Sequence, residues 1–335
     1  MVAELKVKIN VGMIKDRLAK TQAKTKAQVI PVIKNNANGL GFKQIFEAYK
    51  KSGVKMVAAA YAREFLKYDE IKNDTMGKLA WTWNPNEPEY SEVTNLTLVC
   101  KNFEQLAYCI KNKIPYHIAF NIVMNRGGFT KEDFHALYEI VSDNPITITA
   151  HCPYENKDDI LGKYKPLVED LYESLMKYGF NIHEGHFANS AVFRSCEDLH
   201  ADYVRLGEEL LLNKPDEGYV PVTYETYVMA KVKIPKGGNI AYDALKAPYD
   251  MNAIIVPIGY YHVEKIDTIR AAGMDHKAIW SMHDSTVVEF SGDDKVFDKL
   301  KEYEPVTFYN SYDGNGAIQR YFKLNDDLVE YEYSE

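Results

Sequence analysis

The stretch "VIPVIKNNANGLG" (residues 29–41) joins an apolar, β-branched run to a segment rich in Asn and Gly. Such a run predicts a buried strand, and "LGFKQIFEAYKKSG" (40–53) has the apolar spacing of a helix. The two segments together predict one strand–loop–helix unit. Lys34 stands where the strand gives way to the loop, so we expect its amine at the carboxyl end of that strand.

The same alternation of short apolar runs and helical segments continues to about residue 213. Eight strand–helix repeats in about 200 residues fit an α/β protein with a (β/α)8 TIM-type barrel, whose chemistry lies at the carboxyl ends of the strands. A doubly wound open sheet is the structural alternative. The predicted strands span residues 28–33, 55–61, 78–83, 96–100, 116–123, 147–152, 181–186 and 202–207.

Beyond residue 213 the helical repeats stop and β-rich runs broken by Gly, Pro and Asp take their place. These runs cover residues 219–235, 252–263, 278–290 and 316–324. The change predicts a boundary between a barrel domain, residues 1–213, and a mostly β C-terminal domain, residues 214–335.

Composition limits the classes of partner. The formal net charge of −8 across 335 residues, without a long basic run, argues against nucleic acid or an anionic membrane. Four cysteines without CxxC spacing indicate a reducing compartment, and the charged N-terminus does not resemble a signal peptide. We therefore expect a cytoplasmic protein that acts on a small molecule, with no metal centre.

Polar residues gather at the expected strand ends. A lysine near the barrel axis, among apolar walls, would favour the neutral nucleophilic amine that a Schiff base requires, and Lys34 fits this position. His151, His186 and Arg205 also fall at or near strand ends. Taken singly, Lys34 can be a surface lysine and either histidine a hydrogen-bonded core residue, but several such residues at one end of a barrel indicate an active site.

Eight short motifs then occur in an order that resembles the alanine racemase family of pyridoxal-phosphate enzymes. They cover most of the chain: "VIKNNANGLG", "MNRGG", "TAHC", "HFANSA", "VRLG", "GGNIAY", "PIGYY" and "SMHD". The resemblance implies a barrel followed by a β domain, a pyridoxal 5′-phosphate cofactor and a homodimer with shared active sites.

The resemblance implies two catalytic bases. Lys34 resembles the lysine that carries the cofactor and serves one face of the substrate Cα. Tyr260, in "PIGYY", resembles the opposing base, which the partner subunit contributes. Racemisation needs a proton-transfer group on each face, because a single base tends to return the proton to the face it left.

Other positions are implied to hold the cofactor. Arg205 resembles the arginine that faces the pyridine nitrogen, His151 the histidine against the ring, and His186 a residue that supports the arginine. Ser190, at a predicted helix start, resembles part of a phosphate cradle with the N–H groups of Gly207 and Glu208. The full implied set is Lys34, Asn38, Arg126, His151, His186, Asn189, Ser190, Arg205, Gly207, Glu208 and Tyr309.

Substrate contacts are implied at two positions, and an entry-channel residue at a third. Arg126, in "MNRGG", resembles the arginine that contacts the cofactor's phenolic oxygen and orients the substrate carboxylate. Met282 resembles a residue of the partner subunit whose backbone N–H binds that carboxylate, and Tyr242 a tyrosine of the substrate channel. Packing within the β domain is the alternative for Met282 and Tyr242.

The chain also departs from the family pattern. Asn38 stands where a phosphate-contacting tyrosine is usual, and Asn35 where a small residue is usual. Ala119 falls where many members have a carbamate-modified lysine that steers the equivalent of Arg126. Near the C-terminus Tyr309 is the expected restraint on the opposing base, with Asn310 or Tyr312 as alternatives.

The substrate is not determined by these motifs. Alanine is the default, and ornithine, lysine or serine are alternatives, since a carboxylate such as Glu208 could favour a basic side chain. A pyridoxal-phosphate-binding homologue without racemase activity is another alternative. A fold-related decarboxylase is disfavoured because its glycine-rich and cysteine-containing motifs are not found, and a single-barrel homeostasis protein because it would need no β domain.

Overall fold

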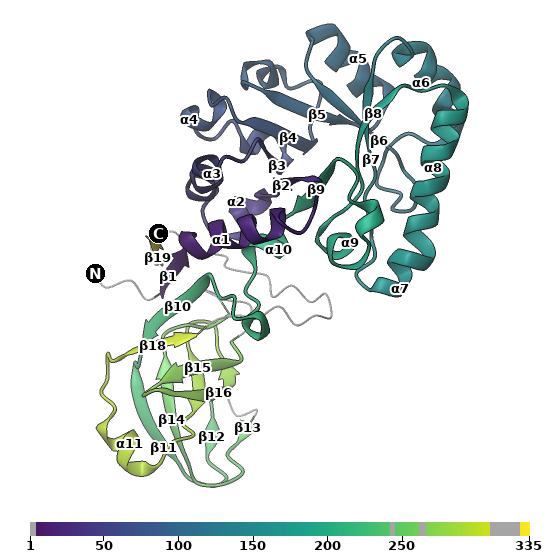
Figure 1. Ribbon diagram of the computed structural model, residues 1–335. Coiled ribbons are helices and arrows are strands. Elements are labelled where there is room, and N and C mark those ends of the chain that lie inside the picture. Colours follow the sequence, from purple (N-terminus) through teal and green to yellow (C-terminus); the bar gives the residue numbers. More distant parts are fainter. Residues whose placement is uncertain (1–4, 242–244, 261–265, 309–328) are drawn as a thin grey trace. The chain divides into compact units, whose positions relative to one another are not determined.

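The computed structural model describes residues 5–241, 245–260, 266–308 and 329–335, and Figure 1 gives their arrangement within each part. The chain divides into two compact units. One is Lys15–Leu211, and the other joins Met1–Ile14 to Leu212–Glu335.

The first unit is a closed ring of parallel strands. Six strands form one sheet in the order β3-β4-β5-β6-β7-β8, and β2 pairs with β9. The predicted strands are all present, which confirms the (β/α)8 barrel. Their bounds are β2 (Gln28–Pro31), β3 (Met56–Tyr61), β4 (Gly77–Thr82), β5 (Leu96–Cys100), β6 (Tyr116–Ala119), β7 (Ile146–Thr149), β8 (Ile182–His186) and β9 (Tyr203–Leu206).

Two parallel bridges close this ring. Val32, just after β2, bridges Ala58 of β3, and Ala188, just after β8, bridges Val204 of β9. The N–H of Arg205 donates to the Ala188 carbonyl at 2.9 Å. The edges of the two sheets are therefore paired with each other, which excludes the open doubly wound sheet.

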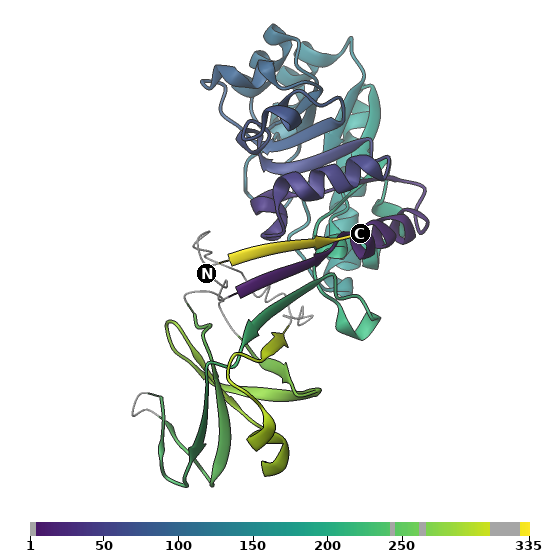
Figure 2. The same cartoon turned by 90° about the vertical axis from the view of Figure 1, so that its left-hand side faces the viewer.

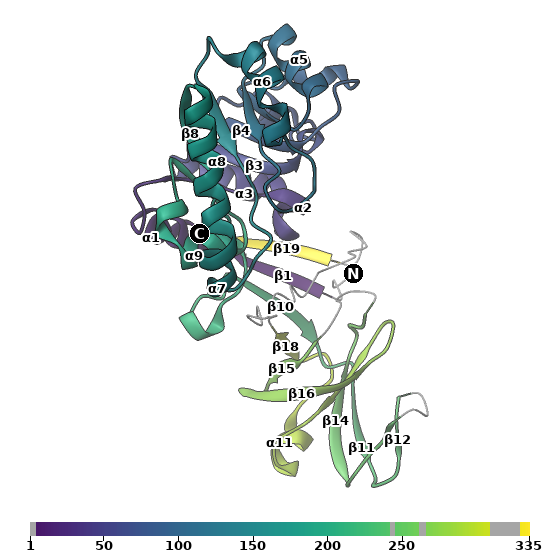
Figure 3. The same ribbon diagram turned by 90° about the vertical axis from the view of Figure 1, so that its right-hand side faces the viewer.

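Helices follow the strands and lie outside the ring (Figures 1 and 3). In α3 the buried residues Phe42, Ile45, Phe46 and Tyr49 recur at helical spacing, so one face packs inward. The helices up to Leu211 are α1 (Val11–Gln22), α2 (Lys34–Asn38), α3 (Phe42–Lys51), α4 (Asp69–Lys72), α5 (Phe103–Asn112), α6 (Phe134–Val141), α7 (Lys157–Asp159), α8 (Lys165–Tyr178), α9 (Ser190–Ser195) and α10 (Glu208–Leu211).

The interior of the ring is filled with side chains. Five successive strands each contribute one residue to a buried cluster: Ile30, Ala58, Leu79, Val99 and Ala119. A barrel of eight strands is just wide enough for such a core. The barrel is thus a packed scaffold, and open chemistry is confined to its ends.

The second unit is built on a nine-stranded sheet with the order β11-β14-β17-β16-β15-β18-β10-β1-β19. The β-rich texture after residue 213 is borne out for the described residues, while the predicted run 316–324 lies outside them. The bounds are β10 (Val222–Tyr227), β11 (Ala230–Ile234), β12 (Asn239–Ile240), β13 (Leu245–Lys246), β14 (Met251–Val256), β15 (Thr268–Ala271), β16 (Met274–Ser281), β17 (Thr286–Glu289), α11 (Asp294–Lys299), β18 (Pro305–Phe308) and β19 (Val329–Ser334).

The N-terminal strand corrects the predicted domain division. β1 (Leu5–Asn10) pairs antiparallel with β10 and parallel with β19, so residues 1–14 belong with the β unit and not with the barrel (Figure 2). Its sequence "LKVKIN" alternates buried and half-buried residues, as a strand with one covered face does. No helix among the described residues is long and apolar enough to cross a membrane.

Candidate active site

The turn after β2 explains the asparagines that follow Lys34. Asn35, Asn36, Ala37 and Asn38 have φ values between 52° and 56°, so they form one left-handed turn. Left-handed backbone is costly for most residues, and Asn is among the few types that tolerate it. The sequence "NNAN" is therefore suited to an abrupt turn that places Lys34 just beyond the carboxyl end of β2.

Side-chain hydrogen bonds hold this turn in place. The buried carboxylate of Glu64 accepts the N–H of Asn35 at 2.9 Å, and Asn36 Oδ1 accepts the N–H of Phe42 at 2.8 Å. Lys34 itself is exposed in the single chain. The expected apolar walls around its amine are thus not supplied by the residues described in this chain, while its position at the active end of the barrel is as predicted.

Arg205 lies fully inside the barrel as a fixed cation. Its guanidinium donates to Thr149 Oγ1 at 3.0 Å, to the Ala150 carbonyl at 3.0 Å, and to both the carbonyl and Nδ1 of His186. Burial, followed by Arg126, lowers the pKa of Arg205 to about 10. The guanidinium therefore stays charged at neutral pH, and these acceptors hold its N–H groups in fixed directions.

The contact with Arg205 determines the tautomers of two histidines. A guanidinium can only donate, so His186 Nδ1 must accept, and the proton of neutral His186 must lie on Nε2. His186 Nε2 is 2.8 Å from Nδ1 of His117, which is then an acceptor. Burial and the Arg205 charge lower the pKa of His117 to about 4 and that of His186 well below its usual value. Both rings are neutral under ordinary conditions.

His151 lies near three of the predicted cationic residues, Arg205, Arg126 and Lys34. Its pKa lies well below the ordinary value because of burial and then the charges of Arg205, Arg126 and Lys34. Its Nδ1 is 3.5 Å from the Arg205 guanidinium. The structure thus brings these four predicted residues into one electrostatic environment, although they come from four different strand ends.

Trp81, which the sequence analysis did not select, lies at the centre of this group. Its ring centroid is 5.3 Å from Arg205 Cζ, 5.7 Å from Arg126 Cζ, 5.6 Å from Lys101 Nζ and 5.8 Å from the His151 ring. The positions of Trp81 and Lys101 are consistent with this arrangement. Trp81 is two residues from Leu79 on β4, so both side chains point into the barrel, and Lys101 directly follows the carboxyl end of β5.

The predicted phosphate cradle lies at the ends of β8 and β9. Asn189 caps the start of α9 by accepting the Val192 N–H at 3.0 Å. Ser190 Oγ accepts the Glu209 N–H at 3.3 Å. A Cβ added at Gly207 would meet the Val32 carbonyl oxygen at 3.3 Å, so glycine allows the two chain segments to approach closely.

Acidic residues lie next to this cradle. Burial, and then the carboxylate of Glu208, raises the pKa of Glu155. Glu209 is buried and pairs with both Arg17 and Arg194. The two paired arginines offset one carboxylate, whereas Glu208 adds negative charge beside the expected phosphate position.

Tyr260 and Met282 lie in the second unit, where one loop contact fixes their backbones. Tyr260, 57% exposed, donates its N–H to the Met282 carbonyl at 2.9 Å, and the Met282 N–H donates to Ser285 at 2.7 Å. A Cβ at Gly259 would lie 2.1 Å from the Met282 carbonyl oxygen. The Met282 N–H is therefore already engaged, and a carboxylate could only share it. Tyr242, Tyr309, Asn310 and Tyr312 lie outside the described residues.

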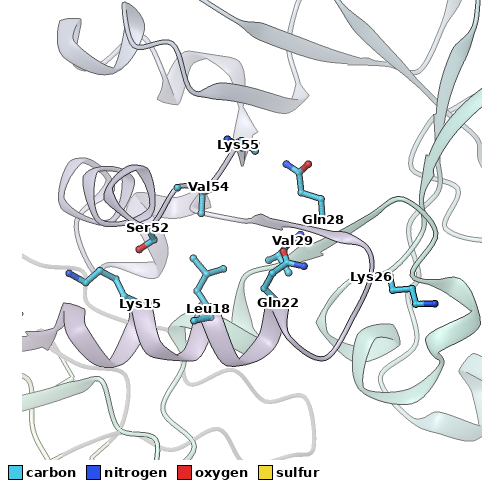
Figure 4. Close-up of a pocket in the computed structure, with 11 residues that line it drawn as sticks. Lys15, Leu18, Gln22, Lys26, Gln28, Val29, Ser52, Val54 and Lys55 are labelled. Atoms are coloured by element: carbon cyan, nitrogen blue, oxygen red, sulfur yellow. Dashed lines mark hydrogen bonds between the residues drawn. The ribbon is translucent and has the colours of Figure 1, made fainter.

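A cavity of about 380 Å³ lies elsewhere in the barrel unit (Figure 4). It is bounded by α1 and by the amino-terminal starts of β2 and β3, the end opposite to barrel chemistry. It is lined by Lys15, Leu18, Ala19, Gln22, Lys26, Gln28, Val29, Ser52, Gly53, Val54 and Lys55. Within the described ranges, no group of three or more His, Cys, Asp or Glu side chains is arranged to hold a metal ion.

Comparison with known proteins identifies the family. The sequence profile described as "Alanine racemase, N-terminal domain" matches residues 9–215. The chain belongs to the alanine racemase family. An alanine racemase of Carboxydothermus hydrogenoformans is 26% identical over 257 residues, which cover 70% of this chain and 69% of that protein. A broad specificity amino-acid racemase of Aeromonas hydrophila is 26% identical over 276 residues, covering 75% and 65%.

Solved structures agree with the fold. The alanine racemase of Acinetobacter baumannii matches with a TM-score of 0.83 at 17% identity, over 99% of this chain and 100% of that one. The biosynthetic alanine racemase of Pseudomonas aeruginosa matches with a TM-score of 0.81 at 16% identity, over all of both chains. The fold is therefore that of these enzymes, and the family as a whole supports an amino-acid racemase.

The first prediction concerns the protonation of Lys101. Burial, and then the charge of Arg126, lowers its pKa to about 8. Its amine should therefore lose its proton near pH 8, whereas ordinary lysines do so near pH ~10.4. Trace acetylation from pH 6 to 11, measured by mass spectrometry, should give Lys101 a labelling midpoint about two pH units below the ordinary lysine value of ~10.4.

Arg126→Met separates the two causes of the lowered Lys101 pKa. It should raise the Lys101 midpoint only part of the way to the ordinary lysine value, because burial contributes more than the charge of Arg126. A midpoint near pH ~10.4 for Lys101 in the wild-type protein would contradict the described environment.

Proposed function

We propose that the protein is a pyridoxal-phosphate-dependent amino-acid racemase, with alanine as the default substrate, that acts as a cytoplasmic homodimer. The observation that carries the proposal is Arg205, a buried cation held among neutral histidines at the end of the barrel where Lys34 also lies. Family membership supports the reaction class. The cofactor, the dimer and the residue roles are the proposed part.

The residues present fit the cofactor. Ser190 and the N–H groups at the start of α10 offer donors to a phosphate. Gly207 has no side chain, so it leaves open the space beside the Val32 carbonyl that a Cβ would occupy. The buried indole Nε1 of Trp81 has no hydrogen-bond partner in the described part of the chain. Lys34 supplies the amine, and Arg205 a fixed donor for the pyridine nitrogen.

Arg205 has one chemical task in this proposal. When bound, pyridoxal phosphate supplies an electron-withdrawing ring that delocalises the charge left at Cα after proton loss. With a pKa of about 10, Arg205 keeps its proton at neutral pH and would offer the ring nitrogen a hydrogen bond without protonating it. Arg205 would thereby limit the charge that the ring takes up and disfavour side reactions.

Lys34 and Tyr260 divide the proton transfer between two faces. Lys34 removes or returns the Cα proton on one face, and Tyr260 of the partner subunit acts on the other. The 57% exposure of Tyr260 in the single chain is compatible with this assignment, since a residue that serves another subunit must be accessible before assembly. Arg126 orients the substrate by its carboxylate.

Other substrates remain open in this proposal. The similarity to a broad specificity amino-acid racemase favours testing ornithine, lysine and serine beside alanine. A homologue that binds the cofactor without racemising is the remaining alternative. Incubation of purified protein with each amino acid in deuterated water separates these cases, because racemisation introduces deuterium at Cα and removes optical activity.

The second prediction is that Lys34 carries the cofactor. Borohydride reduction of the yellow protein should add the pyridoxyl mass to the peptide that contains Lys34, because reduction makes the amine linkage permanent. Tandem mass spectrometry locates the label, and Lys34→Ala provides the unlabelled control. Label on another lysine would remove Lys34 from the proposed role.

The third prediction is that two chains share each active site. Lys34→Ala and Tyr260→Phe proteins should each be nearly inactive. In a mixed dimer one site receives both defects and the other receives neither, so about a quarter of wild-type activity should return after random chain exchange. Native mass spectrometry confirms the mixed dimers. Inactive mixtures that contain mixed dimers would show that each chain builds its own site.

A further inference from the structure

We infer that Lys101 is a second carboxylate-binding cation beside Arg126, and that the racemised substrate is an amino acid with an acidic side chain. The inference rests on the proposed function above. It adds a substrate class and assigns a specificity-determining role to a residue outside the motif series.

Lys101 and Arg126 both hold their charges close to the ring of Trp81. Lys101 follows β5 and Arg126 lies in the loop after the adjacent strand β6. Each places its charge between 5.6 and 5.7 Å from the Trp81 ring centroid. The Lys101 Cδ lies 3.7 Å from the position of a Cβ added at Gly127, so its stem packs against the "RGG" turn. Both charges are therefore fixed at the active end of the barrel.

These two cations have no carboxylate partner within 4 Å in the described ranges. Among the residues that the structure describes, the one hydrogen bond of the Lys101 ammonium goes to Thr82 Oγ1, at 3.5 Å. Surface lysines of the same unit differ, because Lys131, for example, pairs with Asp170 at 2.7 Å. Lys101 is half-buried and Arg126 is exposed. Like charges held near each other raise the free energy of the site, and an anionic ligand would lower it.

Two separate carboxylates fit this arrangement better than one. A carboxylate can occupy an arginine through two parallel hydrogen bonds, so the α-carboxylate uses Arg126. Lys101 then remains for a second anion. Lys101 Cδ lies 3.7 Å from a Cβ built at Gly127, the residue next to Arg126, so one small dicarboxylate such as aspartate or glutamate can reach both cations.

The acidic residues lie on the other side of the ring. Glu208 follows β9, which is directly across the eight-stranded ring from β5. Glu155, whose pKa responds to Glu208, belongs to the same acidic side. Glu155 and Glu208 thus lie beside the phosphate cradle, whereas Lys101 and Arg126 follow β5 and β6 on the opposite side of the ring. This arrangement favours an acidic substrate side chain over the basic one that Glu208 alone would suggest.

The test compares two ligands that differ by one charge. Succinate and succinamate have the same length, but an amide replaces one carboxylate in succinamate, and neither has an amino group that can react with the cofactor. Binding to full-length protein loaded with pyridoxal phosphate is measured by calorimetry for wild type, Lys101→Met and Lys101→Gln. Lys111→Met, a change at an exposed lysine of α5, is the matched control.

We expect wild type and Lys111→Met to prefer succinate about tenfold, because a carboxylate forms a charge-assisted contact that an amide does not. Both Lys101 variants should lose this preference and keep their affinity for succinamate. A preference that is absent in wild type or retained in the variants would overturn the inference. Equal weakening of both ligands would also overturn it, since Lys101 would then share the first carboxylate.

Exchange of the Cα proton separates this inference from the proposed function. In deuterated water, aspartate should exchange faster than asparagine or alanine with the wild-type protein, and Lys101→Met should remove the difference. Faster exchange of alanine would overturn the substrate class while leaving the racemase intact. A lack of exchange with every amino acid would refute the proposed function, even if succinate binding still depended on Lys101.

Discussion

The buried guanidinium of Arg205 is the interaction on which the rest of the site depends. Two carbonyls, a threonine hydroxyl and a histidine nitrogen accept its hydrogen bonds. A charge at this depth is tolerated only when its donors are satisfied, so the neighbouring groups must all present acceptors. That requirement makes His186 neutral and orients it, and through His186 it also determines the state of His117. One cation therefore sets the protonation of two buried histidines.

The barrel fold brings residues that are far apart in the sequence close to Arg205. Closure of the ring brings the carboxyl ends of eight strands to one side, where Arg126, His151 and Arg205 meet around Trp81. The left-handed turn after β2 keeps Lys34 at the same side. The charge is unevenly distributed there: cations lie at the ends of β5 and β6, and the acidic residues Glu155 and Glu208 lie near the phosphate cradle.

Apolar runs were sufficient to predict most of the barrel strands, because most of them are largely buried. The exception is β8, whose sequence "IHEGH" is more polar and only partly buried. The N-terminal strand escaped this criterion, since "LKVKIN" alternates in character and pairs with strands more than 200 residues away. Lys34 and Arg205 could be selected from their positions at strand ends. The roles of Trp81 and His117 could not, because they depend on side chains that reach across the barrel, and the engagement of the Met282 N–H depends on a loop contact that sequence spacing does not reveal.

The protonation states of His186 and His117 test the central claim, that Arg205 sets the electrostatics of the site. Nitrogen-15 NMR of the histidine side chains between pH 5 and 8 distinguishes the two neutral tautomers and the charged ring. We predict that both stay neutral with the proton on Nε2 throughout, since the pKa of His117 is about 4 and that of His186 is also well below the ordinary value. Protonation of either ring near pH ~6.5, the ordinary value for histidine, or a proton on His186 Nδ1, would contradict the account.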